Sequence, residues 1–195
     1  MVDAPGGGED SRRGLLRASL AAGLAVVGAV GVAGCGSTPA AKPVHHLLPP
    51  GVRRHDVKLI NEALALEQRT IAAYTAAGPL LSREAQKVAG WFLGQELLHA
   101  GQLRSLVTQL GGTSHNPLNH YDFGQATGRL QLLELLHSLE QEQIANYLTI
   151  LPLLSSGFAR QGVAAVLAND AQHVYVLQAQ LGRPALPGPL LSASE

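Results

Sequence analysis

The sequence has one cysteine, few aromatic residues and no excess of charge, and each shortage excludes a class of protein. Cys35 is the single cysteine, so no disulfide can form within the chain. Lysine plus arginine and aspartate plus glutamate number 14 each, so the formal net charge is zero. No stripe of basic residues is visible either, which argues against nucleic acid as a partner.

The alternation of apolar and polar residues that marks half-buried strands is also missing. Aromatic residues make up only 4% of the chain. Alanine and leucine dominate instead, as close helix packing prefers. From about Val52 onward the apolar residues recur at steps of three and four, which predicts helices. We therefore expect an all-α fold.

Residues 1–34 have the organisation of an export signal. Arg12 and Arg13 precede an uncharged apolar run, residues 18–33. That run is too short for a stable membrane span, which needs about 20 residues. A basic start, an apolar middle and small residues before a cleavage site are typical of export signals. The Ser-Arg-Arg-x-Leu-Leu-Arg pattern resembles the twin-arginine class, so we expect an exported bacterial protein.

Cys35 follows Val32-Ala33-Gly34 at the end of the apolar run, and this resembles the lipobox of bacterial lipoproteins. We expect Cys35 to carry a lipid and to anchor the mature protein at the outer face of the cell membrane. The alternative is an ordinary signal peptide cleaved near Ala40, which would give a secreted protein. Residues 35–51 are rich in Gly, Ser, Thr and Pro and are predicted to be a flexible tether.

Turn signals divide residues 52–183 into four predicted helices, and residues 184–195 form a tail. Proline is disfavoured inside helices and glycine ends many of them. We therefore place the helix ends at Gly78-Pro79, Gly111-Gly112, Pro152 and Gly182. Ser82 is a predicted N-cap of the second helix. The polar loop of residues 113–125 is long enough to cross the bundle and start a second helical pair.

The first and third helices repeat each other. Residues 67–82 read EQRTIAAYTAAGPLLS and residues 140–155 read EQEQIANYLTILPLLS, and nine of the sixteen positions are identical. The first, Glu, and the eighth, Tyr, are among them. The sequence therefore predicts two copies of one helical hairpin, which form an antiparallel four-helix bundle with matched residues around its central axis.

The second and fourth helices repeat a carboxylate followed three residues later by a histidine, a spacing that places both side chains on one helix face. With one Glu from each of the other helices, six candidate metal ligands lie on apolar faces: Glu67, Glu96, His99, Glu140, Asp170 and His173. Each of the four carboxylates costs several kcal/mol to desolvate in a dry core. Two divalent cations would supply the counter-charge, and the oxygen-rich set favours iron or manganese, with zinc as an alternative.

Several neighbouring residues leave alternatives open. Glu142 is a rival to Glu140, but the repeat and the Glu-to-Tyr spacing of seven favour Glu140. His137 lies one turn before Glu140 and is either an extra ligand or, as we favour, a core histidine. Tyr74 and Tyr147 are predicted to be core residues whose hydroxyls reach the ligand carboxylates.

At these residues the chain resembles the ferritin-like superfamily, and within it the secreted bacterial ferritin-like domain proteins. The similarity covers about residues 55–183 and rests on LINEALALEQRTIAAY, QELLH, LEQEQIANYLTILPLL and NDAQHVYVLQAQLGRP. It implies the same six ligands. Asp170 stands where the family pattern has Glu. Because Asp is one methylene shorter, we expect the metal near Asp170, Glu140 and His173 to be held more weakly than the other.

The sequence is compatible with two functions. The first is an extracytoplasmic di-metal protein, with an oxidoreductase role towards oxygen, peroxide or ferrous iron. Twin-arginine export fits it, because that route moves folded proteins that can keep a metal loaded in the cytoplasm. The second is a non-catalytic four-helix interaction module of the cell envelope with a degenerate metal site. Iron storage is a third, less favoured function. A storage cage needs many subunits with free surfaces, and a membrane-tethered N-terminus does not suit such an assembly.

Overall fold

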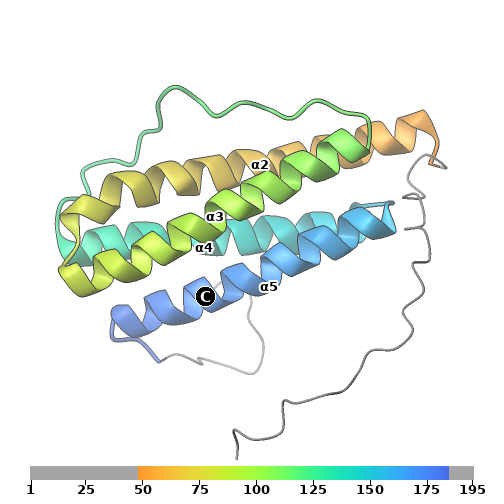
Figure 1. Ribbon diagram of the computed structural model, residues 1–195. Helices are drawn as coiled ribbons and strands as arrows, with labels where there is room; N and C mark the ends of the chain where they lie inside the picture. The colour runs from red at the N-terminus through yellow and green to blue at the C-terminus, as the bar shows by residue number, and fades with distance from the viewer. Residues whose placement is uncertain (1–47, 185–195) are drawn as a thin grey trace, which may run out of the picture. The chain divides into compact units, whose positions relative to one another are not determined.

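The computed structural model describes residues 48–184, which form four long helices and, within this range, no β-strand. In chain order the helices are α2 (Pro50–Ala77), α3 (Arg83–Gln109), α4 (Arg129–Ile150) and α5 (Gly157–Gln180) (Figure 1). Short 3-10 turns follow α2 and α4, namely η2 (Gly78–Leu80) and η3 (Leu151–Leu153). The all-α four-helix prediction is confirmed.

Several predictions concern residues outside the described range: the export signal of residues 1–34, Cys35, most of the tether and nearly all of the tail. Among the helices that are described, none has the length and apolar character to cross a membrane. The first of them begins at Pro50, two residues before the expected Val52. Proline suits the first position of a helix, because its missing N–H would have no partner there.

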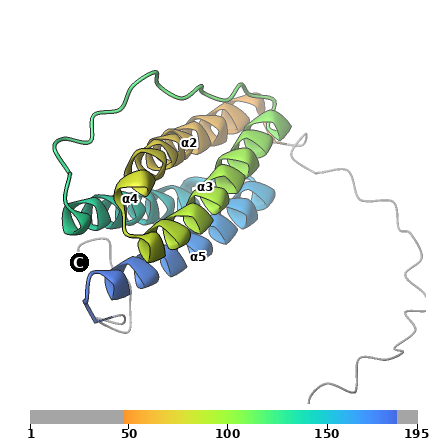
Figure 2. The same cartoon turned by 60° about the vertical axis from the view of Figure 1, so that its left-hand side comes forward.

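The helices pair as two antiparallel hairpins, α2 with α3 and α4 with α5 (Figure 1). The hairpins then pack through α2 against α4 and through α3 against α5, as the second view also shows (Figure 2). Residues 110–128 run along the length of the bundle from the end of α3 to the start of α4. This is the crossing connection that the sequence predicted.

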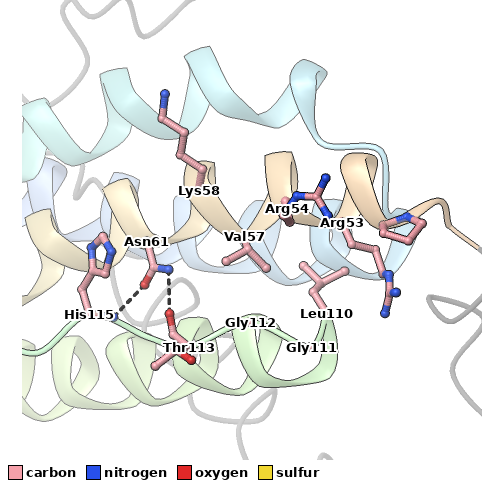
Figure 3. A pocket seen from close by; sticks show the side chains of 11 residues that line it. Arg53, Arg54, Val57, Lys58, Asn61, Leu110, Gly111, Gly112, Thr113 and His115 are labelled. Carbon is pink, nitrogen blue, oxygen red and sulfur yellow. Dashed lines mark hydrogen bonds between the residues drawn. The ribbon is translucent and has the colours of Figure 1, made fainter.

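The long connection is held to α2 by side-chain amides. Asn61 Nδ2 donates to the Thr113 carbonyl at 3.0 Å, and Asn61 Oδ1 accepts from the His115 N–H at 2.8 Å (Figure 3). Gln68 Nε2 donates to the His115 carbonyl at 2.9 Å. The two Asn61 bonds border a pocket of about 570 Å³ between α2 and the connection, and none of the six candidate ligands lines it.

The turn between α4 and α5 contains one residue more than its counterpart between α2 and α3. Ser82 caps α3 by accepting a hydrogen bond from Ala85 N, as predicted, and Ser156 caps α5 by accepting one from Ala159 N. The two caps are 74 positions apart, whereas the helices that precede them repeat at 73. The buried Asp56 carboxylate fixes the longer turn by accepting from Ser156 N at 2.8 Å and from the preceding residue's N–H.

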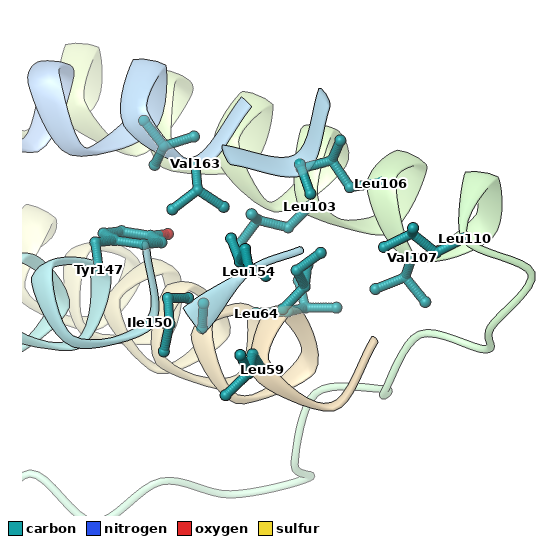
Figure 4. Packing of buried hydrophobic residues seen from close by; sticks show 14 of the residues in the cluster. Leu59, Leu64, Leu103, Leu106, Val107, Leu110, Tyr147, Ile150, Leu154 and Val163 are labelled. Atoms are coloured by element: carbon teal, nitrogen blue, oxygen red, sulfur yellow. The ribbon is translucent and has the colours of Figure 1, made fainter. Parts of the chain in front are cut away.

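The apolar core is divided into two clusters. One includes Leu64, Leu103, Tyr147 and Val163 at the end of the bundle where α3 finishes and α5 begins (Figure 4). The other lies toward the opposite end, and its largest members include Tyr74, Phe92, Leu136 and Leu177. Burial of a side chain of this size stabilises the fold by about 1.5–3 kcal/mol. Along every helix, the candidate ligands fall between the two clusters.

Candidate metal centre

The six predicted ligands come together in the layer between the two apolar clusters. All six side chains are buried, and His99 is the most accessible at 7% exposure. Every helix of the bundle contributes: α2 and α4 give one Glu each, and α3 and α5 each give a carboxylate and a histidine. The repeat places matched residues around the axis, as the sequence predicted. Metal binding by these residues stays a prediction.

The ligand atoms form two groups that share two carboxylates. The atoms of each group all lie within 4.8 Å of one another. The first group consists of Glu67, Glu96, His99 and Asp170, and the second of Glu96, Glu140, Asp170 and His173. Glu96 and Asp170 therefore lie between two candidate metal positions. Each position also has one Glu and one His of its own.

The place of Asp170 differs from the sequence expectation. The repeat assigns it mainly to the position near Glu140 and His173, but Asp170 Oδ1 lies 3.2 Å from His99 Nδ1, in the other half of the site. Asp170 and Glu96 occupy equivalent places on facing helices. A carboxylate at such a place reaches both positions even with the shorter side chain.

The choice of Glu140 over Glu142 as the candidate ligand, which was made from the repeat, agrees with the burial of the two side chains. Glu140 is buried in the cluster, whereas Glu142 is exposed and pairs with Arg69 at 2.7 Å. His137 is buried but belongs to neither group, which agrees with the preferred interpretation as a core histidine. Burial lowers the pKa of His137, so it stays neutral near pH 7.

Many of the inward-facing atoms make no hydrogen bond within residues 48–184, although some lie within ion-pair distance of a ligand in the same cluster. They are Glu67 Oε2, Glu96 Oε1, His99 Nδ1, Glu140 Oε2 and both Asp170 oxygens. A buried polar atom without a hydrogen bond costs about 1–3 kcal/mol, and more when it is charged. Atoms of this kind gathered around one point fit a cation, since a cation would satisfy all of them at once. The residues present therefore suit a dinuclear metal site.

Two tyrosines link the hairpins across the site. Tyr74 on α2 donates its hydroxyl to Glu140 Oε1 on α4 at 2.6 Å, and Tyr147 on α4 donates to Glu67 Oε1 on α2. Each tyrosine thus holds the carboxylate that belongs to the other copy of the repeat. The prediction that these hydroxyls reach the ligand carboxylates is confirmed.

Two amides, which sequence reasoning missed, hold the histidines in a similar crossed arrangement. His99 Nε2 lies 2.9 Å from Asn169 Oδ1, and His173 Nε2 lies 2.5 Å from Gln95 Oε1. An amide oxygen only accepts, so each Nε2 carries a proton, and Nδ1 is the ring atom that can bind a metal once its own proton is lost. The Nδ1 atoms point at the carboxylates, with His173 Nδ1 lying 3.1 Å from Glu96 Oε1.

A signal for these amides was present in the sequence. In both copies an amide residue directly precedes the carboxylate, as Gln95 precedes Glu96 and Asn169 precedes Asp170. A third amide, Gln143, donates to Glu96 Oε2 at 3.1 Å. The crossed contacts fix which ring nitrogen faces the carboxylates, as partners of metal-bound histidines commonly do.

The electrostatics of the cluster favour bound protons as long as no other cation is present. Burial raises the pKa of Glu140 to about 8 and raises that of Glu67 well above its ordinary value. Burial would lower the pKa of His99, but bonds to Asp170 and Glu96 outweigh it and raise the pKa to about 10. His173 is likewise raised, to about 9, by Glu140 and Glu96 against the effect of burial. The cluster thus attracts positive charge.

The comparison with protein families agrees with this geometry. Residues 55–183 match the family model described as the ferritin-like domain. The chain belongs to the ferritin-like family. The match covers all four helices except the first turn of α2, and it confirms the resemblance to this superfamily that the sequence motifs suggested.

Solved structures share the fold of this ferritin-like chain at low sequence identity. A conserved hypothetical protein from Mycobacterium tuberculosis is 16% identical with a TM-score of 0.63, and the match covers 66% of this chain and 98% of that one. A ferritin-like, diiron-carboxylate protein from Bacillus anthracis is 22% identical with a TM-score of 0.60, over 67% and 97% of the two chains.

A third neighbour is a bacterioferritin from Rhodobacter capsulatus, described with a metal-free dinuclear site and haem iron. It is 19% identical with a TM-score of 0.56, over 65% of this chain and 83% of that one. A search of curated proteins found no significant match. At these identities the likeness of the three structures shows the fold alone.

Proposed function

We propose that this ferritin-like protein is an extracytoplasmic di-metal protein, in which iron or manganese handles oxygen, peroxide or ferrous iron. The observation that carries the proposal is the sharing of Glu96 and Asp170 between two buried ligand groups, in which several inward-facing atoms make no hydrogen bond. An interaction module that needs no metal would gain nothing from burying four carboxylates together, since burial of a charge is costly.

The ligands divide simply between two ions. Glu67 and His99 would belong to one ion, and Glu140 and His173 would belong to the other, with Glu96 and Asp170 common to both. When bound, two such ions supply electrons to a small oxidant. The similar protein from Bacillus anthracis is described as a diiron-carboxylate protein, which supports iron as the first metal to test.

The side chains around the ligands keep the site dry and correctly protonated. Burial raises the pKa of both Tyr74 and Tyr147 well above 10, so their hydroxyls stay protonated and donate to the carboxylates. Phe92 stacks on the His173 ring with the ring centroids 4.1 Å apart. The two apolar clusters close the core on either side of the ligand layer.

The proposed location rests on sequence motifs outside the described residues. Arg12 and Arg13 support export through the twin-arginine route, and Cys35 supports a lipid anchor at the outer face of the cell membrane. A metal loaded before export would be retained, because the ligands are buried in a folded core.

Metal content tests the function directly. We expect the purified protein, loaded with ferrous or manganous ions without oxygen, to hold two ions per chain by elemental analysis. Glu140→Ala should lower the metal content, while Glu142→Ala is the matched control, because Glu142 is exposed two residues away. If the unaltered protein takes up neither metal, the envelope interaction module becomes the better account.

A further inference from the structure

Helix α3 presents an apolar face to solvent that the bundle does not cover. Trp91 is 71% exposed, Leu97 is 54% exposed and Leu98 is 73% exposed. Every exposed residue between Lys87 and Arg104 is uncharged. Contiguous apolar surface of this kind marks an interaction site more often than scattered single residues do.

Three glycines on the same face are not required by the fold. A Cβ added at Gly90, Gly94 or Gly101 would meet no atom within 4 Å among the described residues. Each glycine nevertheless costs a helix about 1 kcal/mol relative to alanine. We therefore infer that these glycines serve a contact outside the bundle. A glycine leaves a recess on the helix surface, and a second helix can place a large side chain in that recess.

We propose that this face binds a second copy of the chain, with the two α3 helices antiparallel about a two-fold axis at Gly94. A two-fold interface uses the same patch on both subunits, so the patch must be complementary to itself. On helical spacing, Trp91 then lies beside the partner's Leu98, and the recess at Gly90 lies beside the partner's Leu97. Large side chains on each copy thus meet large side chains or recesses on the other.

The charges at the ends of the face support this arrangement. Glu84 and Arg104 lie ten residues before and ten residues after Gly94, and neither forms an ion pair within the described part of the chain. The antiparallel two-fold brings Glu84 to the level of the partner's Arg104 at both ends. A parallel pairing would instead bring like charges together, which is unfavourable. A lipid surface would leave these two charges unmatched.

The first test uses Trp91, which is the only tryptophan in the chain. The full chain carrying Cys35→Ser, which removes the native thiol, should dimerise reversibly in sedimentation experiments. The Trp91 emission should shift to the blue over the same concentration range, because the ring leaves water. A monomer at every concentration would overturn the proposal. So would an emission shift that needs added lipid vesicles, which would assign the face to a membrane.

The second test locates the two-fold axis. In the same background, Gly94→Cys should form a disulfide-linked dimer on mild oxidation, because two Cβ atoms at the axis can approach to about 4 Å. Ala168→Cys is the matched control, an exposed position on α5. Equal cross-linking of the two variants would contradict the proposed axis.

The third test concerns the end charges. Glu84→Arg should weaken the dimer by roughly tenfold or more, because it opposes two positive charges. The double variant Glu84→Arg with Arg104→Glu exchanges the charges and should restore the dimer. Failure of the double variant to recover would show that these residues do not face each other. Metal content should stay unchanged throughout, because neither residue belongs to the buried cluster.

Discussion

The Tyr74 hydroxyl on α2 donates to Glu140 on α4 at 2.6 Å, across the boundary between the two hairpins. In the other copy of the repeat, Tyr147 on α4 donates an equivalent hydrogen bond to Glu67 on α2. Neither hairpin alone can satisfy its own Glu in this way. The layer of candidate ligands therefore also holds the two halves of the repeat together.

Loss of this bond should weaken the metal-free fold. Tyr74→Phe removes the shorter of the two hydrogen bonds to Glu140 Oε1 and leaves only the contact with His173 Nδ1 at 3.2 Å, so we expect the free energy of unfolding to fall by about 1–3 kcal/mol. Urea unfolding in the presence of a chelator measures the change. Tyr175→Phe is the control, because Tyr175 is exposed on α5. An equal effect of the two substitutions would argue against a role for the buried bond.

Asp170 should be needed by both metal ions. Because it belongs to both ligand groups, Asp170→Ala should remove both ions together, whereas Glu67→Ala should mainly affect one. Asp170→Glu should keep both. Metal titration followed by elemental analysis distinguishes these outcomes. If Asp170→Ala retains one tightly bound ion, the sequence-based expectation of two unequal halves is correct and the shared position is wrong.

The crossed amides should tune metal affinity without touching the metal. Gln95→Leu removes the acceptor of His173 Nε2, and loss of such a partner typically costs 10- to 100-fold in affinity, so we expect a decrease of roughly that size. Gln172→Leu serves as the control, because its amide bonds only within its own helix. Competition with a chelating dye reports the affinity. Unchanged affinity in Gln95→Leu would mean that the ring is held by its packing alone.

The metal-free fold should lose stability as pH rises. The pKa of Glu140 is raised from 4.5 to about 8, that of His99 from 6.5 to about 10 and that of His173 from 6.5 to about 9. A raised pKa means that the folded state binds the proton more tightly, so the stabilisation is complete below the unfolded value and is lost as pH rises through the folded value.

Urea unfolding between pH 6.5 and 10, with chelator present, should therefore show decreasing stability. With metal present the trend should flatten or reverse, because metal ions replace the same protons. A metal-free protein whose stability stays level over this range would contradict the assigned protonation. The double variant His99→Gln with His173→Gln is the control and should show a smaller slope.

The predicted location has its own test in cells. Cys35→Ser should release the protein from membranes, because the lipid would have no attachment point. Replacement of Arg12 and Arg13 with Lys should block export, because the twin-arginine pattern is lost. Membrane fractionation at high salt reads out the first change and protease accessibility the second. Continued membrane attachment of Cys35→Ser would refute the anchor, and undiminished export would indicate the general secretory route.

The internal repeat explains why so much of the site was predictable. The repeat identified Glu67 and Glu140 as equivalent residues. The apolar spacing predicted the helices of the bundle, because residues at steps of three and four share one helix face. The same spacing did not show that Asp170 reaches the half of the site that contains His99. That depends on how two helices from different hairpins face each other. The roles of Gln95 and Asn169 were hidden for the same reason, since each acts on a histidine of another helix.

The extra residue in the turn before α5 sets the rotation of that helix about its own axis. One residue corresponds to about 100° of turn in an α-helix, so deletion of Ser155 would rotate Asp170 and His173 out of the ligand layer even though neither residue changes. Asp56, which binds the N–H groups of this turn, therefore sets the phase of α5 from several turns away. Changes at this end of the bundle should therefore disrupt the proposed metal site even when all six candidate ligands are kept.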